Sequence, residues 1–146
     1  MGTVKQLFVV VGLAVLASAI SKDAPVEELK TRLQSTNNPD EKAKLCVAIA
    51  ERQLANADKL FQAGNTSQAQ AAVRDVVAYS GQARDAADVT GHRAKDTEIA
   101  VRKMIHHLTD MKRSLSFEDQ GPVQSAIDQM EKMRTDLLNR MFKSTK

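Results

Sequence analysis

The sequence predicts an all-α protein, and its composition, its apolar spacing and the positions of its helix-ending residues all favour that fold class. Aromatic residues make up 3% of the 146 residues, and only six glycines and three prolines occur. Unbranched side chains dominate, and these lose little rotamer freedom in a helix. Apolar residues recur every three or four positions, the period of a helix with one buried face. The length suits a single domain.

The N-terminal segment, residues 1–19, has the pattern of a secretory signal peptide. Lys5 precedes an apolar run over 7–16, and Ala17-Ser18-Ala19 fits the small-x-small cleavage rule. The uncharged span is shorter than the roughly 20 apolar residues of a membrane-spanning helix. We therefore expect cleavage after Ala19, a folded domain over 20–146 and a periplasmic or secreted location. A retained membrane anchor is the alternative.

A short helix is expected after Pro25, which suits a first helical turn because its missing N–H would have no partner there. Three apolar residues lie at helical spacing on one face of it, namely Val26, Leu29 and Leu33. The segment Asn37-Asn38-Pro39 should end this helix, because the residue before a proline is pushed out of the helical region.

The second helix should begin at Pro39, after Asn38, and run to about Ala63. Asn38 can act as the cap, and Asp40 and Glu41 place negative charge where the helix dipole favours it. Gly64 can then adopt the left-handed conformation that closes many helices. The expected inward stripe consists of Cys46, Ile49, Ala50, Gln53, Ala57, Leu60 and Phe61. Cys46, the only cysteine, is expected to be buried and inert.

The third helix should begin at Asn65 or Thr66, with Asn65 and Gln68 as a capping pair. An apolar stripe of alternating four- and three-residue steps runs from Ala69 to Leu115 and passes through Gly91 without a change of phase. One glycine inside a helix costs only about 1 kcal/mol. The pattern therefore predicts one long central helix over about 66–114, on the order of 70 Å long. A compact four-helix bundle broken at Gly91 is the alternative.

The last helix should start near Pro122, with Asp119 or Gly121 as its cap. Its expected apolar stripe is Val123, Ile127, Met130, Leu137, Leu138, Met141 and Phe142. Because the preceding linker is short, this helix should fold back antiparallel on the second half of the long helix. The helix over about 39–63 should pack in the same way on its first half.

Two resemblances accompany these patterns. Residues 57–76 resemble the helical hairpin of a tetratricopeptide repeat in the pair Leu60-Phe61, the turn Gly64-Asn65 and Ala69, but no second copy follows at a 34-residue period. The runs TEIAVRKMIHHLTDMKRSL and FEDQGPVQSAIDQMEKMRTDLLNRMF are similar to small exported bacterial α-helical proteins of unassigned function. The second resemblance implies export and helical structure, and it brings no substrate or catalytic residue.

No catalytic motif or phosphate-binding glycine pattern occurs, so we expect a protein that is not an enzyme and needs no cofactor. The formal net charge of +3 makes no case for nucleic acid as a partner. The expected function is binding of a protein partner, or self-association, through helix faces, with at most weak contact to a membrane surface. The alternative is a periplasmic copper module built from thioether and imidazole ligands, with Met104, His107, Met111 and Met130 as candidates. Core packing of these methionines is the interpretation we favour.

Overall fold

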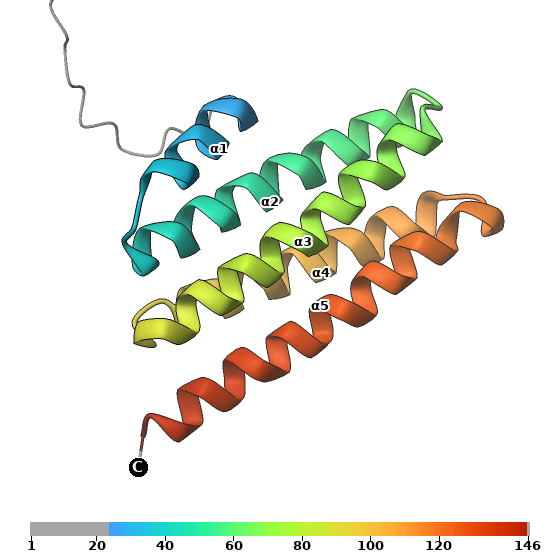
Figure 1. Cartoon of the computed structure of the whole chain (residues 1–146). Coiled ribbons are helices and arrows are strands. Elements are labelled where there is room, and N and C mark those ends of the chain that lie inside the picture. Colours follow the sequence, from blue (N-terminus) through green and yellow to red (C-terminus); the bar gives the residue numbers. More distant parts are fainter. Residues whose placement is uncertain (1–23, 146) are drawn as a thin grey trace, which may run out of the picture.

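The computed structural model describes residues 24–145, and in this part of the chain every regular element is an α-helix (Figure 1). The prediction of an all-α fold is thus confirmed. The helices are α1 (Val26–Ser35), α2 (Pro39–Gln62), α3 (Thr66–Thr90), α4 (Ala94–Ser114) and α5 (Phe117–Lys143). The predicted signal peptide lies outside the described residues. Within residues 24–145, no helix combines the length and the apolar character that crossing a membrane requires.

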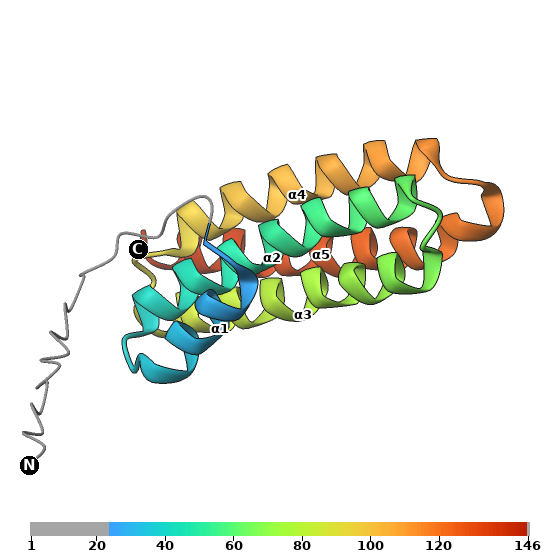
Figure 2. The same ribbon diagram turned by 90° about the horizontal axis from the view of Figure 1, so that it is seen from above.

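Helices α2 to α5 form a bundle, and α1 lies against the outside of α2 (Figures 1 and 2). Each of the pairs α2–α3 and α4–α5 is an antiparallel hairpin, and these two pairs make the largest contacts in the molecule. The two hairpins stack so that α3 lies beside α5 and α2 lies beside α4, with the neighbours running in the same direction (Figure 2). The turn from α3 to α4 therefore crosses one end of the bundle diagonally.

The expectation of one helix over 66–114 is wrong, because the chain reverses at Gly91. Gly91 has a φ of 78°, which is left-handed, and its N–H donates to the carbonyl of Ala87 at 2.9 Å. This conformation ends a helix at little cost for glycine, which has no Cβ to clash. The reversal also lets α4 bury its apolar face inside the bundle, whereas a single rod would have left more of that face in water.

The apolar stripe that suggested a continuous helix is nevertheless buried on both sides of the turn. Val76, Ala83 and Ala87 in α3 are fully buried, as are Val101 and Leu108 in α4. The connection takes only Gly91, His92 and Arg93. Such a short turn, which leaves both stripes facing the same core, does not shift their sequence spacing. The unbroken spacing of the stripe thus predicted correctly that these residues are buried, and predicted wrongly that they belong to one continuous helix.

Most predicted helix ends agree with the structure. Asn38 caps α2, and its Oδ1 accepts hydrogen bonds from the N–H groups of Asp40 at 2.9 Å and Glu41 at 3.2 Å. Gly64 closes α2 with a φ of 78°, so the hairpin expected over 57–76 is present. The capping pair proposed for Asn65 is wrong, because its side chain makes no capping hydrogen bond.

Helix α5 begins earlier than predicted, at Phe117, so that Gly121 and Pro122 lie inside it. Ser116 precedes its first turn, and its hydroxyl donates to Asp119 Oδ2 at 2.9 Å. Pro122 removes the hydrogen bond to the carbonyl four residues earlier, which belongs to the exposed residue Glu118, so water can replace that bond. Phe142, expected on the buried stripe, is 71% exposed.

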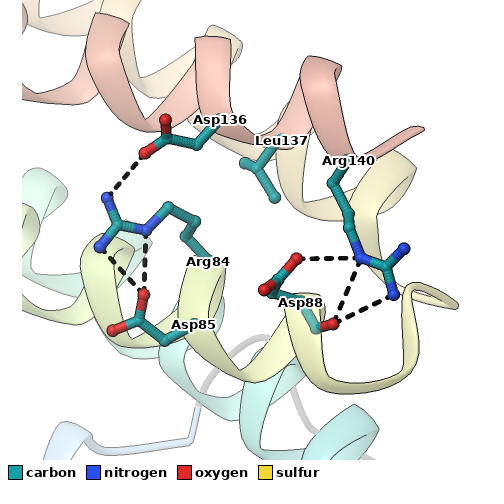
Figure 3. A pocket seen from close by; sticks show the side chains of 6 residues that line it. All are labelled: Arg84, Asp85, Asp88, Asp136, Leu137 and Arg140. Carbon is teal, nitrogen blue, oxygen red and sulfur yellow. Dashed lines mark hydrogen bonds and ion pairs between the residues drawn. The ribbon is translucent and has the colours of Figure 1, made fainter. Parts of the chain in front are cut away.

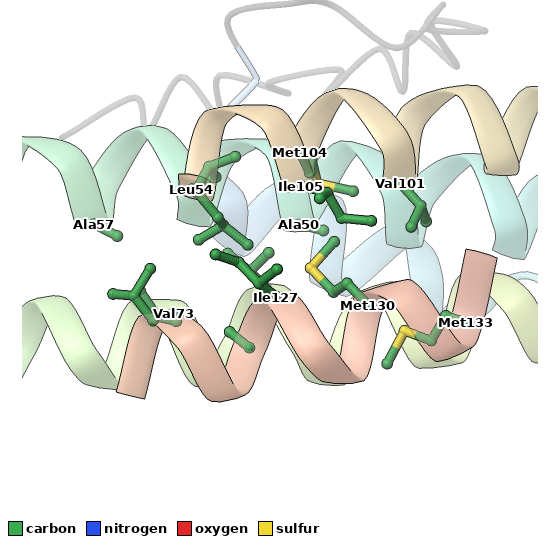
Figure 4. Close-up of a cluster of buried hydrophobic side chains, with 14 of the residues drawn as sticks. Ala50, Leu54, Ala57, Val73, Val101, Met104, Ile105, Ile127, Met130 and Met133 are labelled. Atoms are coloured by element: carbon green, nitrogen blue, oxygen red, sulfur yellow. The ribbon is translucent and has the colours of Figure 1, made fainter. Parts of the chain in front are cut away.

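The main core lies between the four long helices and is made of short aliphatic side chains and methionines (Figure 4). A smaller cluster under α1 joins Leu29 to Leu45 and Ile49, and Val26 and Leu33 pack against it. Cys46 is buried, with 1% of its surface exposed, as expected. Burial raises the pKa of its thiol to about 11, so the thiol stays protonated at neutral pH.

Candidate functional site: the groove between α3 and α5

Helices α3 and α5 lie side by side in a regular parallel register. Arg84 bonds to Asp136, and Arg140 bonds to Asp88, and in both pairs the residues are 52 positions apart. Gly81 of α3 faces Met133 of α5 one turn closer to the start of both helices. A Cβ placed on Gly81 would lie 3.5 Å from the terminal methyl of Met133, so the helices are also in contact there. The two helices therefore run together along most of their length, and their outer face has one long seam.

A hollow of about 510 Å³ opens along this seam near the start of both helices. Its lining comes from Gln70, Val73, Arg74, Val77 and Ala78 of α3 and from Pro122, Ser125, Ala126 and Gln129 of α5. Val73 and Ala126 are each 2% exposed and form its floor. The volume lies within the roughly 300–1,000 Å³ that is usual for binding pockets.

The hollow exists because the facing side chains are short. Ala78, Ser125 and Ala126 end at their first or second side-chain atom, so they leave space between two helices that longer side chains would fill. The rim is polar: the amide of Gln129 donates to Ser125 at 3.3 Å, and Arg74 has no ion pair with any residue that the structure describes. The groove therefore combines an apolar floor with one uncompensated positive charge.

The seam closes toward the other end through paired charges (Figure 3). Arg84 of α3 reaches Asp136 of α5 at 3.1 Å, and it also contacts Asp85 at 2.9 Å. Arg140 of α5 reaches in the opposite sense to Asp88 of α3, with 2.9 Å between Nε and Oδ1. Each helix thus contributes one arginine and one carboxylate to the cross-helix contacts.

These charges leave a smaller hollow of about 200 Å³ over the buried Leu137. Both arginines are engaged by carboxylates of the same surface, and Arg140 also donates to the carbonyl oxygen of Asp88 at 3.3 Å. Because the charges already satisfy one another, this end of the seam fixes the register of the helices and offers no free group for a ligand.

Among the residues that the structure describes, one carboxylate is almost fully buried, and it is neutralised. Glu98 of α4 is 6% exposed, and its Oε1 accepts from Arg134 Nε at 2.9 Å and lies 3.5 Å from Arg102 Nε. A general acid or base needs a pKa near the working pH and access to a substrate. Glu98 lies between two arginines at the α4–α5 contact, which is the position of a structural ion pair.

The residues of the copper alternative lie in two different environments. Met104, Met111 and Met130 are 2%, 4% and 0% exposed and lie in the apolar core. Figure 4 shows Met104 and Met130 among the buried side chains. His107, by contrast, is on the surface, with its Nε2 3.4 Å from Asp58 Oδ2. In residues 24–145, no group of three His, Cys, Asp or Glu side chains is placed to hold a metal ion.

Comparison of the chain with protein-family models, with curated proteins and with solved structures finds no match. The groove was not anticipated from the sequence, and the only signal for it is the set of short residues Ala78, Ser125 and Ala126 beside the apolar stripes. That signal cannot be interpreted without knowing that α3 and α5 are neighbours.

Proposed function

We propose that the chain is an exported, non-catalytic binding protein of the bacterial cell envelope, and that it holds a helix of a protein partner in the groove between α3 and α5. The observation that carries this proposal is the hollow of about 510 Å³ with an apolar floor and a polar rim. Export rests on the signal-peptide pattern of residues 1–19 and on the resemblance to small exported helical proteins.

The shape and charge of the groove suit an amphipathic partner helix. From Gln70 to Ala78 the α3 side spans about two helical turns, or on the order of 12 Å. That length accommodates apolar side chains from positions i and i+3 or i+4 of an amphipathic helix. Arg74 at the rim lacks a carboxylate among the described residues, so an acidic residue on the partner helix would complement it.

Site-specific photo-crosslinking from the exported protein tests this proposal. A photoreactive phenylalanine analogue is placed at Ala78 in the groove or, as the control, at Ala55, which is also an exposed alanine but lies on α2. We expect a discrete adduct from position 78 and none from position 55. A probe at Ser125, which also lines the groove, should give an adduct as well, and Ala78→Trp should abolish that adduct. Equal labelling from 55 and 78 would contradict the groove, and an adduct of twice the chain's own mass would identify self-association instead.

The export component is measured separately. N-terminal sequencing of the natively produced protein should find a start at Ile20, and fractionation should place it outside the cytoplasm. A protein that still begins at Met1 or Gly2 would contradict the proposed location, and this result would leave the proposal for the groove unaffected.

A further inference from the structure

Another hollow lies on a different side of the molecule, where α1, α2 and α3 meet. It has a volume of about 360 Å³ and is lined by Lys30, Leu33, Gln34, Lys42, Tyr79 and Gln82. Two of these six residues are cationic at neutral pH and none is acidic. The volume is sufficient for a small molecule. A concave site with two ammonium groups and no carboxylate in its wall has the charge of an anion-binding site.

The positive charge of this pocket is not neutralised from its surroundings. Lys42 makes no ion pair with any residue in the part of the chain that the structure describes. Its neighbour Glu41 is held elsewhere, by the hydroxyl of Thr36 at 2.7 Å and by Arg32 at 3.8 Å. Lys30 has only the loose contact to Glu27, at 3.8 Å, and that carboxylate side chain is 87% exposed.

The remaining wall supplies apolar contact and hydrogen bonds. The Lys30 ammonium lies 5.8 Å from the centroid of the Tyr79 ring, which fixes both groups in the pocket. Leu33 and Tyr79 pack partly buried against the apolar cluster under α1, so they are held in place. The side-chain amides of Gln34 and Gln82 have no hydrogen-bond partner within residues 24–145, which leaves both amides free for a ligand.

We propose that this pocket binds a small organic anion. Its carboxylate or phosphate group lies between the ammonium groups of Lys30 and Lys42, and its carbon part lies against Leu33 and Tyr79. The amides of Gln34 and Gln82 provide further hydrogen bonds. This site is independent of the groove between α3 and α5, because no residue lines both hollows.

The sequence provides a direct probe, because Tyr79 is its only tyrosine. Protein labelled with 3-fluorotyrosine therefore gives a single fluorine resonance, which reports on the pocket. The probes are benzoate and phenyl phosphate, with benzyl alcohol as the neutral analogue and sodium chloride at matched ionic strength as the salt control. We expect a saturable shift with at least one of the two anions and none with the alcohol or with chloride. The anion that binds then identifies the preferred acidic group.

Variants separate a built site from general electrostatic attraction. Lys42→Gln should weaken anion binding about tenfold or more, since a charge-assisted hydrogen bond is worth roughly 1.5–3 kcal/mol. Lys42→Arg should retain it. Lys44→Gln removes the same charge two residues away, where the side chain lines a different hollow between α2 and α4, and it should leave binding nearly unchanged. Three results would each overturn the proposal. The first is equal weakening of anion binding by Lys42→Gln and Lys44→Gln. The others are a shift with benzyl alcohol equal to that with the anions, and the absence of a saturable shift with either anion.

Discussion

Single residues in this protein were predicted best where their environment follows from the chain's own local pattern. Burial of Cys46, capping by Asn38 and the left-handed conformation of Gly64 all follow from neighbours close in sequence. Exposure of Phe142 and the surface position of His107 depend on which helix packs opposite, and short-range spacing does not contain that information. For Cys46, burial also raises the pKa of the thiol.

Burial of Cys46 should make the stability of the protein fall at high pH. The folded-state pKa of the thiol is raised from its ordinary value near 9 to about 11. The unfolded chain therefore loses this proton from about pH 9, while the folded protein keeps it. The stabilisation is complete below pH 9 and is lost as pH rises toward 11, by about 1.4 kcal/mol per pH unit.

The measurement is urea unfolding at pH 8, 9, 10 and 11, with Cys46→Ala as the control that lacks the thiol but retains the lysines and Tyr79. The wild-type free energy of unfolding should decline more steeply than that of the variant. Parallel curves would show that the thiol ionises equally well in the folded state.

At the scale of helices, the glycines differ in conformation: some end a helix and others lie inside one. Gly64 and Gly91 both have a φ of 78°, whereas Gly81 lies inside α3 with a helical neighbourhood. The sequence alone could not distinguish Gly91 from Gly81, because each stands inside an uninterrupted apolar stripe. What distinguishes them is tertiary: α4 gains more buried surface by turning back than by extending α3.

Alanine at these three glycines should therefore change stability with different signs. Gly64→Ala should destabilise by about 1 kcal/mol, because a left-handed alanine is strained and nothing else lies near its Cβ. Gly91→Ala should cost more, since its Cβ would also lie 3.2 Å from the Arg140 guanidinium. Gly81→Ala should stabilise by up to about 1 kcal/mol, because the position is helical and the new methyl would meet Met133 at an ordinary contact distance of 3.5 Å.

Chemical denaturation of the three variants gives these differences. An Arg140→Met background supplies the control, because the excess cost of Gly91→Ala over Gly64→Ala should shrink there. A stabilising Gly91→Ala would mean that the helix is continuous through this position.

At the scale of the whole molecule, helix composition and pairing along the sequence were predictable, and the arrangement of the two hairpins was not. The antiparallel pairs α2–α3 and α4–α5 follow from short linkers of few residues. The parallel contacts of α3 with α5 and of α2 with α4 join residues about 50 positions apart, as in Arg84–Asp136 and Asp58–His107. The groove between α3 and α5 depends on packing between the two hairpins, and the anion pocket depends on packing of α1 against the first hairpin, which is why neither was expected.

Small-angle scattering distinguishes the bundle from the extended shape. The longest helix, α5, has 27 residues and is therefore about 40 Å long. Residues 20–146 should have a radius of gyration near the roughly 14 Å of a compact domain of this size. A helix of about 70 Å would give a clearly larger radius and a longer maximum dimension, and such a result would contradict the reversal at Gly91.

Because the turn at Gly91 joins the two hairpins, the chain can be cut there into two fragments of one hairpin each. The Asp40–Thr90 hydrogen bond and the Arg140–Asp88 ion pair both end on residues before Gly91, so a cut between Gly91 and His92 would spare them. Each fragment would then keep one complete hairpin, and the missing peptide bond would remove the effective concentration that the tether provides. Reassociation of the two fragments would thus measure the affinity of one hairpin for the other. Unfolding of the intact chain does not measure this affinity separately from the stability of the whole protein.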